Sequence, residues 1–484
     1  MDGISADGLF ELRYAESDVS MKKVESLKRT FVLLMSVVGL MVNIAGYAYV
    51  WIQVYHRNLV WNVKFTFWGH VLMVCVYGVL LFFFAASFGG LKIGYLKVGD
   101  VFFAQLFANL IDGVITFFQI SLMENRLVYS VPMLWLILCQ SLVSFVWIVL
   151  CDRLYIKLFP PRKLLLIYGE HAIDDIVNKF DTRKNKYRIE KCINISEGID
   201  KVKEESKNPR YNGVIIWDIP TAVRNNLLKF CYSRNIRMYM MPKISDVIIK
   251  GSDQLHLFDT PVLLTREYAL KVEQRFFKRS IDIVCSVVLL VILSPIMLVT
   301  AIIIKLQDGG PVFYKQIRCT INAKEFKIMK FRSMRVDAEK DGVARLATKN
   351  DSRITPYGKF IRATRIDEIP QLINILKGDM SFIGPRPERP EIIKQYMEEM
   401  PEFAFRMKVK AGLAGYAQVY GKYNTTPYDK LKLDLTYIEN YSVWLDIQLM
   451  VLTIKVLFTP DATEGVDSSQ LTAMKKEATD DTNM

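Results

Sequence analysis

The stretch Ile283-Val-Cys-Ser-Val-Val-Leu-Leu-Val-Ile-Leu-Ser-Pro-Ile-Met-Leu-Val-Thr-Ala-Ile-Ile-Ile304 decides on which side of a membrane the second half of this chain lies. The run is long enough to cross a bilayer as a helix. Ser294 and Pro295 stand at its centre, where a proline removes one backbone hydrogen bond and kinks or breaks the helix. Basic residues flank both ends, namely Lys278, Arg279 and Lys305. Two structures remain open on this pattern: a re-entrant helix over 281–305 that returns to the same face, and a kinked helix that crosses.

Four further apolar segments precede this run, at about 31–54, 65–88, 101–122 and 130–151. Each has the length of a membrane-spanning helix. Basic residues are concentrated before the first segment and after the fourth, so the positive-inside rule predicts that both ends of the bundle are cytosolic. We therefore expect a cytosolic segment over 1–29 and four transmembrane helices over 30–152.

Between the bundle and the central run, residues 162–262 alternate short apolar stretches with helical patterns. The strand-like stretches are 163–169, 214–217 and 237–241, and the helical patterns reach Phe180 and cover 221–234. This alternation predicts a small parallel α/β domain of Rossmann-like type. Gly169 stands alone where the GxGxxG fingerprint of dinucleotide binding would be, so we interpret the domain as structural or regulatory.

Composition narrows the class of protein. The chain has 484 residues, is 51% hydrophobic and carries a formal net charge of +13, which suits a mixed membrane and cytosolic protein with anionic lipid or phosphorylated partners. No stretch reads as a zinc finger or an arginine-rich recognition helix, so nucleic acid is not an expected partner. The seven cysteines form no CxxC pair and the four histidines have no HExxH spacing, which argues against a zinc hydrolase.

Two adjacent carboxylates, Asp367 and Glu368, stand just before Pro370. A proline is tolerated only in the first turn of a helix, so the pattern predicts a helix that starts at about Asp367. Free backbone N–H groups at such an end favour anions and create a place for phosphate. Because Asp is also a common helix cap, the pair alone leaves a capping role open.

Basic residues surround the pair in the sequence. In an extended segment Lys330 and Arg332 share a face, an arrangement suited to a diphosphate, although a solvated basic face has the same pattern. Arg386 lies between two prolines in Gly384-Pro-Arg-Pro387. This rigid loop could hold the guanidinium in place to bind a phosphate, or it could be a structural turn with an exposed arginine. The chain contains no Asp-x-Asp pair, which weakens a reading as a metal-dependent glycosyltransferase that moves only the sugar.

Residues 275–460 resemble the bacterial sugar transferase family, the monotopic polyprenyl-phosphate phosphoglycosyl transferases. The motifs that carry the resemblance are Lys278-Arg-Ser-Ile-Asp282, Leu293-Ser-Pro295, Gly310-Pro-Val-Phe-Tyr-Lys-Gln316, Lys330-Phe-Arg-Ser-Met-Arg335, Asp367-Glu-Ile-Pro-Gln371, Gly378-Asp-Met-Ser-Phe-Ile-Gly-Pro-Arg-Pro387, Gly415-Tyr-Ala-Gln-Val419 and Leu445-Asp446. With its preceding spans and α/β domain, the chain is similar to the large form of this family. Its catalytic domain would cover 270–460.

The resemblance implies a chemical role for the carboxylate pair. Asp367 would attack the sugar-bearing phosphate of a UDP-sugar, expel UMP and form an aspartyl phosphosugar. Undecaprenyl phosphate would then take the sugar phosphate, the first step of exopolysaccharide or capsule synthesis, with glucose or galactose as the expected sugar. Glu368 would order Mg²⁺ or move the acceptor's proton, and Asp367 is itself a candidate Mg²⁺ ligand. The implied phosphate ligands are Lys330, Arg332, Arg362 and Arg386.

The resemblance also implies where the protein acts. UDP-sugars are cytosolic, which favours the re-entrant helix broken at Ser294-Pro295 and a catalytic domain on the cytosolic face of the bacterial inner membrane. The stretch 437–458 is expected to be an amphipathic helix in the membrane interface and 461–484 a disordered tail. Membrane lipid is an expected partner, and a homodimer is left open. The rival reading is a catalytically silent membrane scaffold.

The motifs depart from the family pattern in two places. Arg318 is followed by Cys319-Thr320 where the family commonly has Val-Gly, and Lys410-Ala-Gly-Leu-Ala-Gly-Tyr416 lacks a proline that the family usually has there. The second change lies in a loop expected to face the nucleotide, so it bears most directly on the specificity for the sugar and the nucleotide.

Overall fold

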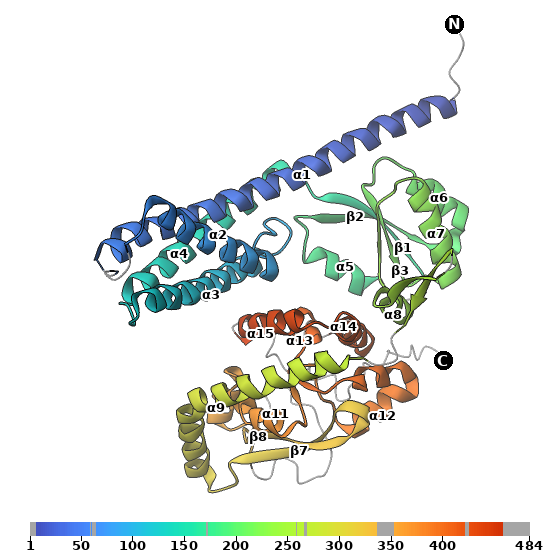
Figure 1. Ribbon diagram of the computed structural model, residues 1–484. Helices are drawn as coiled ribbons and strands as arrows, with labels where there is room; N and C mark the ends of the chain where they lie inside the picture. The colour runs from blue at the N-terminus through green and yellow to red at the C-terminus, as the bar shows by residue number, and fades with distance from the viewer. Residues whose placement is uncertain are drawn as a thin grey trace. The chain divides into compact units, whose positions relative to one another are not determined.

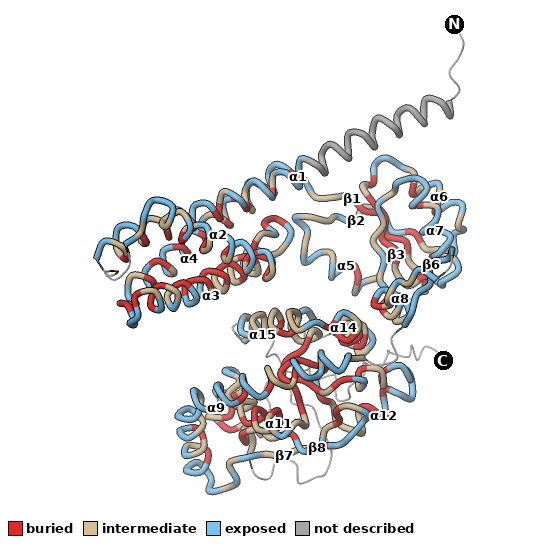
Figure 2. Tube along the Cα trace, viewed as in Figure 1, coloured by how far each residue is buried: buried red, intermediate tan, exposed pale blue. Residues whose placement is uncertain are grey.

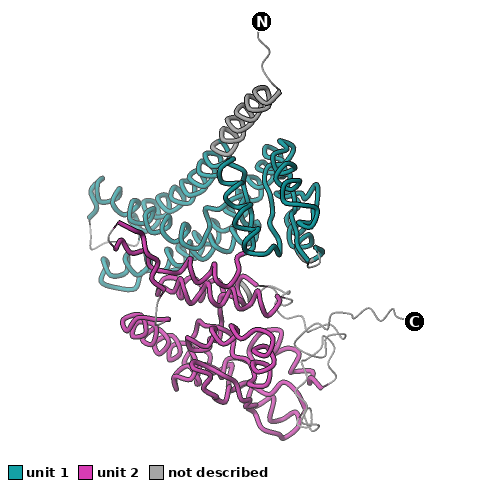
Figure 3. Tube along the Cα trace, turned by 90° about the vertical axis from the view of Figure 1, so that its right-hand side faces the viewer, with its two compact units in different colours: residues 1–241 teal, residues 242–484 magenta. Residues whose placement is uncertain are grey.

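The computed structural model describes residues 6–58, 60, 64–170, 173–257, 259–265, 269–335, 353–421 and 425–457. The chain forms two compact units, residues 1–241 and 242–484 (Figure 3). The expected tail 461–484 lies outside the described residues.

The first unit begins with a group of long apolar helices (Figure 1). They are α1 (Ala6–Val50), which continues as a π-helical segment over Trp51–His56, α2 (Phe67–Phe88), α3 (Val98–Glu124) and α4 (Val131–Leu158). Large apolar side chains point outward from them, for example Trp68, Leu122 and Leu142, as expected of helices surrounded by lipid. Among the described residues, these helices and α9 are long and apolar enough to cross a membrane.

The rest of this unit is a parallel sheet with helices. Its elements are β1 (Arg162–Tyr168), α5 (Asp174–Asp181), β2 (Tyr187–Asn194), α6 (Ile199–Ser206), β3 (Gly213–Trp217), α7 (Thr221–Ser233) and β4 (Met238–Met240), with the strand order β2-β1-β3-β4. Figure 2 shows the buried residues concentrated on β1 and β3. The mixed α and α/β content is as expected. The sequence missed β2, because this strand pairs only with β1 and carries charged residues.

Within the described residues, the second unit contains a long helix and three two-stranded sheets, one of which is the antiparallel pair of β5 and β6. Its elements are α8 (Ile244–Lys250), β5 (Asp253–Leu257), β6 (Thr260–Leu264), α9 (Val272–Asp308), β7 (Phe313–Cys319), β8 (Glu325–Phe331), α10 (Pro356–Ala363), α11 (Gln371–Lys377), β9 (Ser381–Ile383), α12 (Pro390–Glu399), a 3₁₀ segment over Pro401–Lys408, β10 (Gly412–Ala414), α13 (Tyr416–Tyr420), α14 (Pro427–Glu439) and α15 (Val443–Leu457). β7 and β8 form an antiparallel hairpin, whereas β9 and β10 pair in parallel.

Helix α9 contains the long apolar run 283–304 with Ser294 and Pro295 at its centre. Pro295 lies inside the helix, and Ser294 Oγ donates a hydrogen bond to Val291 O (2.8 Å). Figure 1 shows α9 as two arms that meet at a bend. The helix is therefore bent but continuous, which is a common effect of a proline inside a helix because it lacks the N–H for one backbone hydrogen bond.

The beginning of α9 is tied into the core of the second unit. Lys278 Nζ donates to Asp446 Oδ2 (2.7 Å), to the carbonyl of Ile383 (2.8 Å) and to Tyr437 OH (3.0 Å). One turn on, Asp282 Oδ1 accepts hydrogen bonds from Ser381 Oγ and the backbone N–H of 382. The helix is thus fixed to β9 and to the C-terminal helices.

The C-terminal apolar stretch differs from its expected form. Two helices, α14 and α15, replace the single interfacial helix over 437–458, and they are separated at 440–442. Asp446 does not mark a solvated polar face, because it is buried and pairs with Lys278. The sequence pattern was misread here because a buried carboxylate with a distant partner has no local signature.

Candidate active site

The carboxylate pair lies in a single 3₁₀ turn over Ile366–Glu368. Arg365, just before it, has a left-handed backbone (φ 58°), which few non-glycine residues adopt. Helix α11 begins only at Gln371, with Pro370 as its cap residue, so the expected helix start at Asp367 is wrong by one turn. The turn and Pro370 together present both carboxylates ahead of the helix.

Glu368 is held by two cations. Its Oε1 lies 2.7 Å from Lys330 Nζ and 3.2 Å from Arg386 Nη2. Burial alone would raise the pKa of Glu368, but Lys330 and Arg386 outweigh it and hold that pKa well below its ordinary value. Glu368 is therefore ionised at neutral pH and neutralises part of the positive charge around it.

Asp367 has the opposite environment. Within the described residues it has no hydrogen bond or ion pair. Burial and the charge of Glu368 raise its pKa to about 6, although Lys330 and Arg362 act in the other direction. At neutral pH most of its carboxylate is ionised yet unpaired, which leaves its oxygens free to react. The environment thus assigns different tasks to two neighbouring carboxylates.

The backbone of the Gly-Pro-Arg-Pro loop is fixed by two arginines, the buried Arg406 and the partly buried Arg318. Arg406 Nη2 donates to the carbonyl of Arg386 (3.0 Å), and Arg318 Nη1 donates to the carbonyl of Pro387 (3.1 Å). Glu388 lies between the two guanidinium groups, 3.5 Å from Arg318 and 3.9 Å from Arg406. The side chain of Arg386 therefore projects towards Glu368 from a rigid base.

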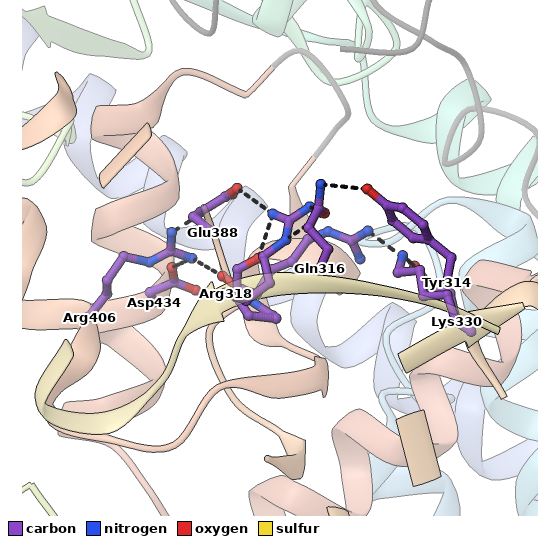
Figure 4. A network of polar contacts seen from close by, with 10 residues as sticks. Tyr314, Gln316, Arg318, Lys330, Glu388, Arg406 and Asp434 are labelled. Carbon is purple, nitrogen blue, oxygen red and sulfur yellow. Dashed lines mark hydrogen bonds and ion pairs between the residues drawn. The ribbon is translucent and has the colours of Figure 1, made fainter. Parts of the chain in front are cut away.

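These contacts belong to a longer polar network (Figure 4). Arg406 also pairs with Asp434 (2.8 Å), and Arg318 Nη2 donates to Gln316 Oε1 (2.7 Å). Figure 4 shows the labelled side chains in a row from Arg406 and Asp434 to Tyr314 and Lys330. Burial lowers the pKa of Arg318 to about 10, so its guanidinium remains charged at neutral pH.

Glycine at 412 lets the loop pack closely on β10. A Cβ atom on Gly412 would lie 2.1 Å from the backbone nitrogen of Gly384. Because that neighbour is backbone, it cannot rotate away, and only glycine fits at this crossing.

The structure brings together some of the expected phosphate ligands and separates others. Lys330 and Arg386 meet at Glu368, and Arg362 lies close enough to Asp367 to lower its pKa. Arg332 instead pairs with Asp308, at the end of α9, and its Nε and Nη1 atoms have no hydrogen-bond partner within the described residues.

Sequence reasoning missed the residues that support the loop. They are Arg318, Glu388, Arg406 and Asp434. Of these, Glu388 offered a signal, since it directly follows the Gly-Pro-Arg-Pro motif. Arg406 and Asp434 are distant in sequence, and nothing in their local pattern indicates that they pair.

The site fits a metal ion only together with a substrate. Within the described part of the chain, no three His, Cys, Asp or Glu side chains gather to hold a metal. Mg²⁺ is commonly bound through one or two carboxylates plus substrate phosphates and water. Asp367 and Glu368 match that requirement, so the residues present fit an ion shared with a bound diphosphate.

The helices and the site define a membrane protein with a carboxylate pair set among basic side chains. The sequence profile described as "Bacterial sugar transferase" matches residues 273–460. The chain belongs to the bacterial sugar transferase family.

Several named proteins are similar to this chain. The UDP-N-acetylgalactosamine-undecaprenyl-phosphate N-acetylgalactosaminephosphotransferase of Aeromonas hydrophila is 39% identical over 235 residues, which are 47% of this chain and 54% of that protein. The undecaprenyl-phosphate galactose phosphotransferase of Salmonella typhimurium is 35% identical over 239 residues, 46% of this chain and 49% of that protein. The UDP-glucose:undecaprenyl-phosphate glucose-1-phosphate transferase of Caulobacter vibrioides is 36% identical over 189 residues, 38% of this chain and 70% of that protein. The chain thus matches about half the length of the first two.

Proposed function

We propose that this protein transfers a sugar 1-phosphate from a UDP-sugar to undecaprenyl phosphate and releases UMP. The observation that carries the proposal is the difference between the two carboxylates: Glu368 is neutralised by Lys330 and Arg386, whereas Asp367 has no hydrogen bond or ion pair to any described residue and a pKa of about 6. The names of the three similar proteins, which all transfer sugar phosphates to undecaprenyl phosphate, support the substrate class.

The reaction proceeds in two displacements at one phosphorus atom. An oxygen of Asp367 attacks the phosphorus that bears the sugar, a P–O bond to the UMP part breaks, and UMP leaves with the bond's electron pair. The product is an acyl phosphate between Asp367 and the sugar. A phosphate oxygen of undecaprenyl phosphate then attacks the same phosphorus, which gives the lipid-linked sugar diphosphate and regenerates the Asp367 carboxylate.

The basic residues stabilise the transferring phosphate. Lys330 and Arg386 donate charge-assisted hydrogen bonds to Glu368, and the donor's phosphate oxygens share these donors when the substrate binds. Glu368 orders the site through these two cations. Mg²⁺, bound by the carboxylate pair and the diphosphate, would neutralise charge that develops on the phosphate oxygens.

We infer a membrane arrangement that brings both substrates to the site. Helices α1 to α4 cross the bilayer with both ends in the cytosol, and α9 enters and leaves on the cytosolic side at its bend. The bend at Pro295 and the basic residues at both ends of α9 support this arrangement. The catalytic unit then lies on the inner face of the bacterial cytoplasmic membrane, where the UDP-sugar arrives from solution and undecaprenyl phosphate from the lipid.

The test separates this mechanism from its rivals. The purified protein is incubated with each of a panel of UDP-sugars (glucose, galactose, N-acetylgalactosamine) and undecaprenyl phosphate, with product nucleotides separated by chromatography. We expect UMP release with one sugar and, without acceptor, a sugar-phosphate adduct on Asp367 by mass spectrometry. Asp367→Asn abolishes both, while Glu398→Gln, a charge loss on the exposed face of α12, changes neither. Release of UDP would refute the phosphate transfer, and no nucleotide from any UDP-sugar would favour the silent scaffold.

A further inference from the structure

The interior of the helix group α1 to α4 holds a polar cluster that the transfer reaction does not use. Asn109, Asp112 and Thr116 lie on one face of α3, at the spacing of successive helical turns, and each is at most 1% exposed. Asn43 and Tyr47 lie one turn apart on α1, at 5% and 0% exposure. Charged and polar side chains at such depth in a membrane bundle are costly and commonly functional.

The four helices meet at this polar cluster. Tyr47 of α1 stacks on Tyr77 of α2 with ring centroids 4.0 Å apart. Tyr77 OH donates to Gln140 Oε1 of α4 (3.1 Å), and Gln140 Nε2 donates to the carbonyl of Asn43 (2.9 Å). Asp112 of α3 interacts electrostatically with both tyrosines, so it faces the same interior.

In the part of the chain that the structure describes, Asp112 has no partner that would offset the burial of its charge. Both carboxylate oxygens are without a hydrogen bond within the described residues, and so are Asn43 Oδ1, Tyr47 OH and Thr116 Oγ1. Burying an unpaired carboxylate in its charged form is strongly unfavourable, so the group must be neutralised. The buried basic side chains described in this unit are Lys28, which lies over the Phe159 ring, and Arg224 of α7, and neither pairs with Asp112.

The unpartnered atoms define the kind of guest that would fit. Asp112 Oδ1, Asp112 Oδ2 and Asn43 Oδ1 can only accept, and the two hydroxyl oxygens can accept as well. Among the atoms of this cluster that lack a partner, Asn109 Nδ2 is a hydrogen-bond donor, so acceptors outnumber donors. A surplus of oxygen acceptors around one carboxylate favours a guest with a single positive charge.

We propose that Asp112 is the centre of a monovalent-cation site inside the membrane bundle, filled by a proton or by a sodium ion. The oxygens of Asn43, Tyr47 and Thr116 surround the guest together with the carboxylate. The proposal rests on the membrane-spanning arrangement of α1 to α4 and is independent of the sugar-phosphate transfer.

The titratable groups that face Asp112 are few. They are Tyr47 of α1 and Tyr77 of α2. The α4 side chains bonded to this cluster are Gln140, which bonds Tyr77, and Ser144, which bonds Asn43, and neither titrates. Because both tyrosines are neutral below strongly alkaline pH, a response to mild acid in this cluster belongs to Asp112.

The test measures the melting temperature of the full-length protein in lipid nanodiscs. In one arm sodium chloride replaces choline chloride at constant ionic strength and slightly alkaline pH. In the other arm the pH is lowered in sodium-free buffer. Because a guest that binds only the folded state stabilises it, we expect the melting temperature to rise in at least one arm. If the melting temperature rises with sodium alone, the bound cation is a sodium ion. If it rises at lower pH alone, the bound cation is a proton.

Variants separate this site from general effects on the protein. The Asp112→Asn variant has a neutral side chain of the same shape, so its melting temperature no longer rises under the condition that stabilises the wild type. The Asp100→Asn variant, changed at the start of α3, keeps that rise. Tyr47→Phe removes one oxygen and shifts the midpoint of the response to higher sodium or lower pH. Equal responses of the wild type and Asp112→Asn in both arms would overturn the proposal. If Asp112→Asn does not fold, a midpoint in Tyr47→Phe equal to that of the wild type overturns it.

Discussion

Replacing Lys330 by methionine removes the nearest cation from the carboxylate pair and keeps a side chain of similar length. Lys330 lowers the pKa of both carboxyls, so its loss raises that of Asp367 above about 6. Removal of one nearby charge from a partly buried site corresponds to a rise of roughly one unit. At pH 7 the ionised fraction of Asp367 then falls from about nine-tenths to about one-half.

The assay is the initial rate of UMP release as a function of pH. The nucleophile must be ionised, so the rate falls on the acid side of the Asp367 pKa, and Lys330→Met moves that limb about one pH unit upward. The plateau at high pH also falls by about 10- to 100-fold, because a charge-assisted hydrogen bond to phosphate is lost.

A matched control lies on the same strand. Lys327 of β8 is exposed, and Lys327→Met removes the same charge without contact to either carboxylate. We expect its acid limb and plateau to equal those of the wild type. An acid limb that stays in place in Lys330→Met, or that moves equally in both variants, would refute the electrostatic assignment of Asp367.

Three further variants test the support of the site. Asp446→Asn leaves Lys278 buried without its counter-charge and lowers stability by about 3 kcal/mol, seen as a lower melting temperature. Arg406→Lys loses the planar grip on the carbonyl of Arg386, so kcat/KM for the UDP-sugar falls by about tenfold, while the acid limb stays in place. Gly412→Ala forces a Cβ against backbone and lowers stability by about 2 kcal/mol, measured by thermal unfolding, whereas Gly99→Ala, with open space around it, does not.

The local patterns of the sequence predicted much of the fold. The long apolar helices were recognisable by their length, and β1 and β3 were recognisable because burial on both faces produces continuous apolar runs. The edge strand β4 was also recognisable, because its residues Met238–Met240 are apolar although they are only partly buried. The edge strand β2 was not, because it is partly exposed and charged. The helix start near Asp367 was placed one turn early, since a 3₁₀ turn and a helix impose the same requirement on a following proline.

The candidate site was predictable only in part for a related reason. Lys330 and Arg386 belong to dense local motifs, and they meet at Glu368. Arg332 belongs to the same motif as Lys330, but it pairs with Asp308 at the end of α9. The pattern of the strand does not predict this ion pair, because Asp308 comes from a different element. Arg406 and Asp434 become partners only when the chain folds, so their role depends on tertiary structure alone.

The tie between Lys278 and β9 has a mechanical consequence. Lys278 at the base of α9 holds the carbonyl of Ile383, the residue directly before the loop that carries Arg386. Together with Asp282, which accepts hydrogen bonds from β9, Lys278 couples the base of α9 to the loop that presents the Arg386 guanidinium. If α9 enters the bilayer as proposed, a change in the depth of this helix is expected to move the Arg386 guanidinium with it relative to the lipid surface.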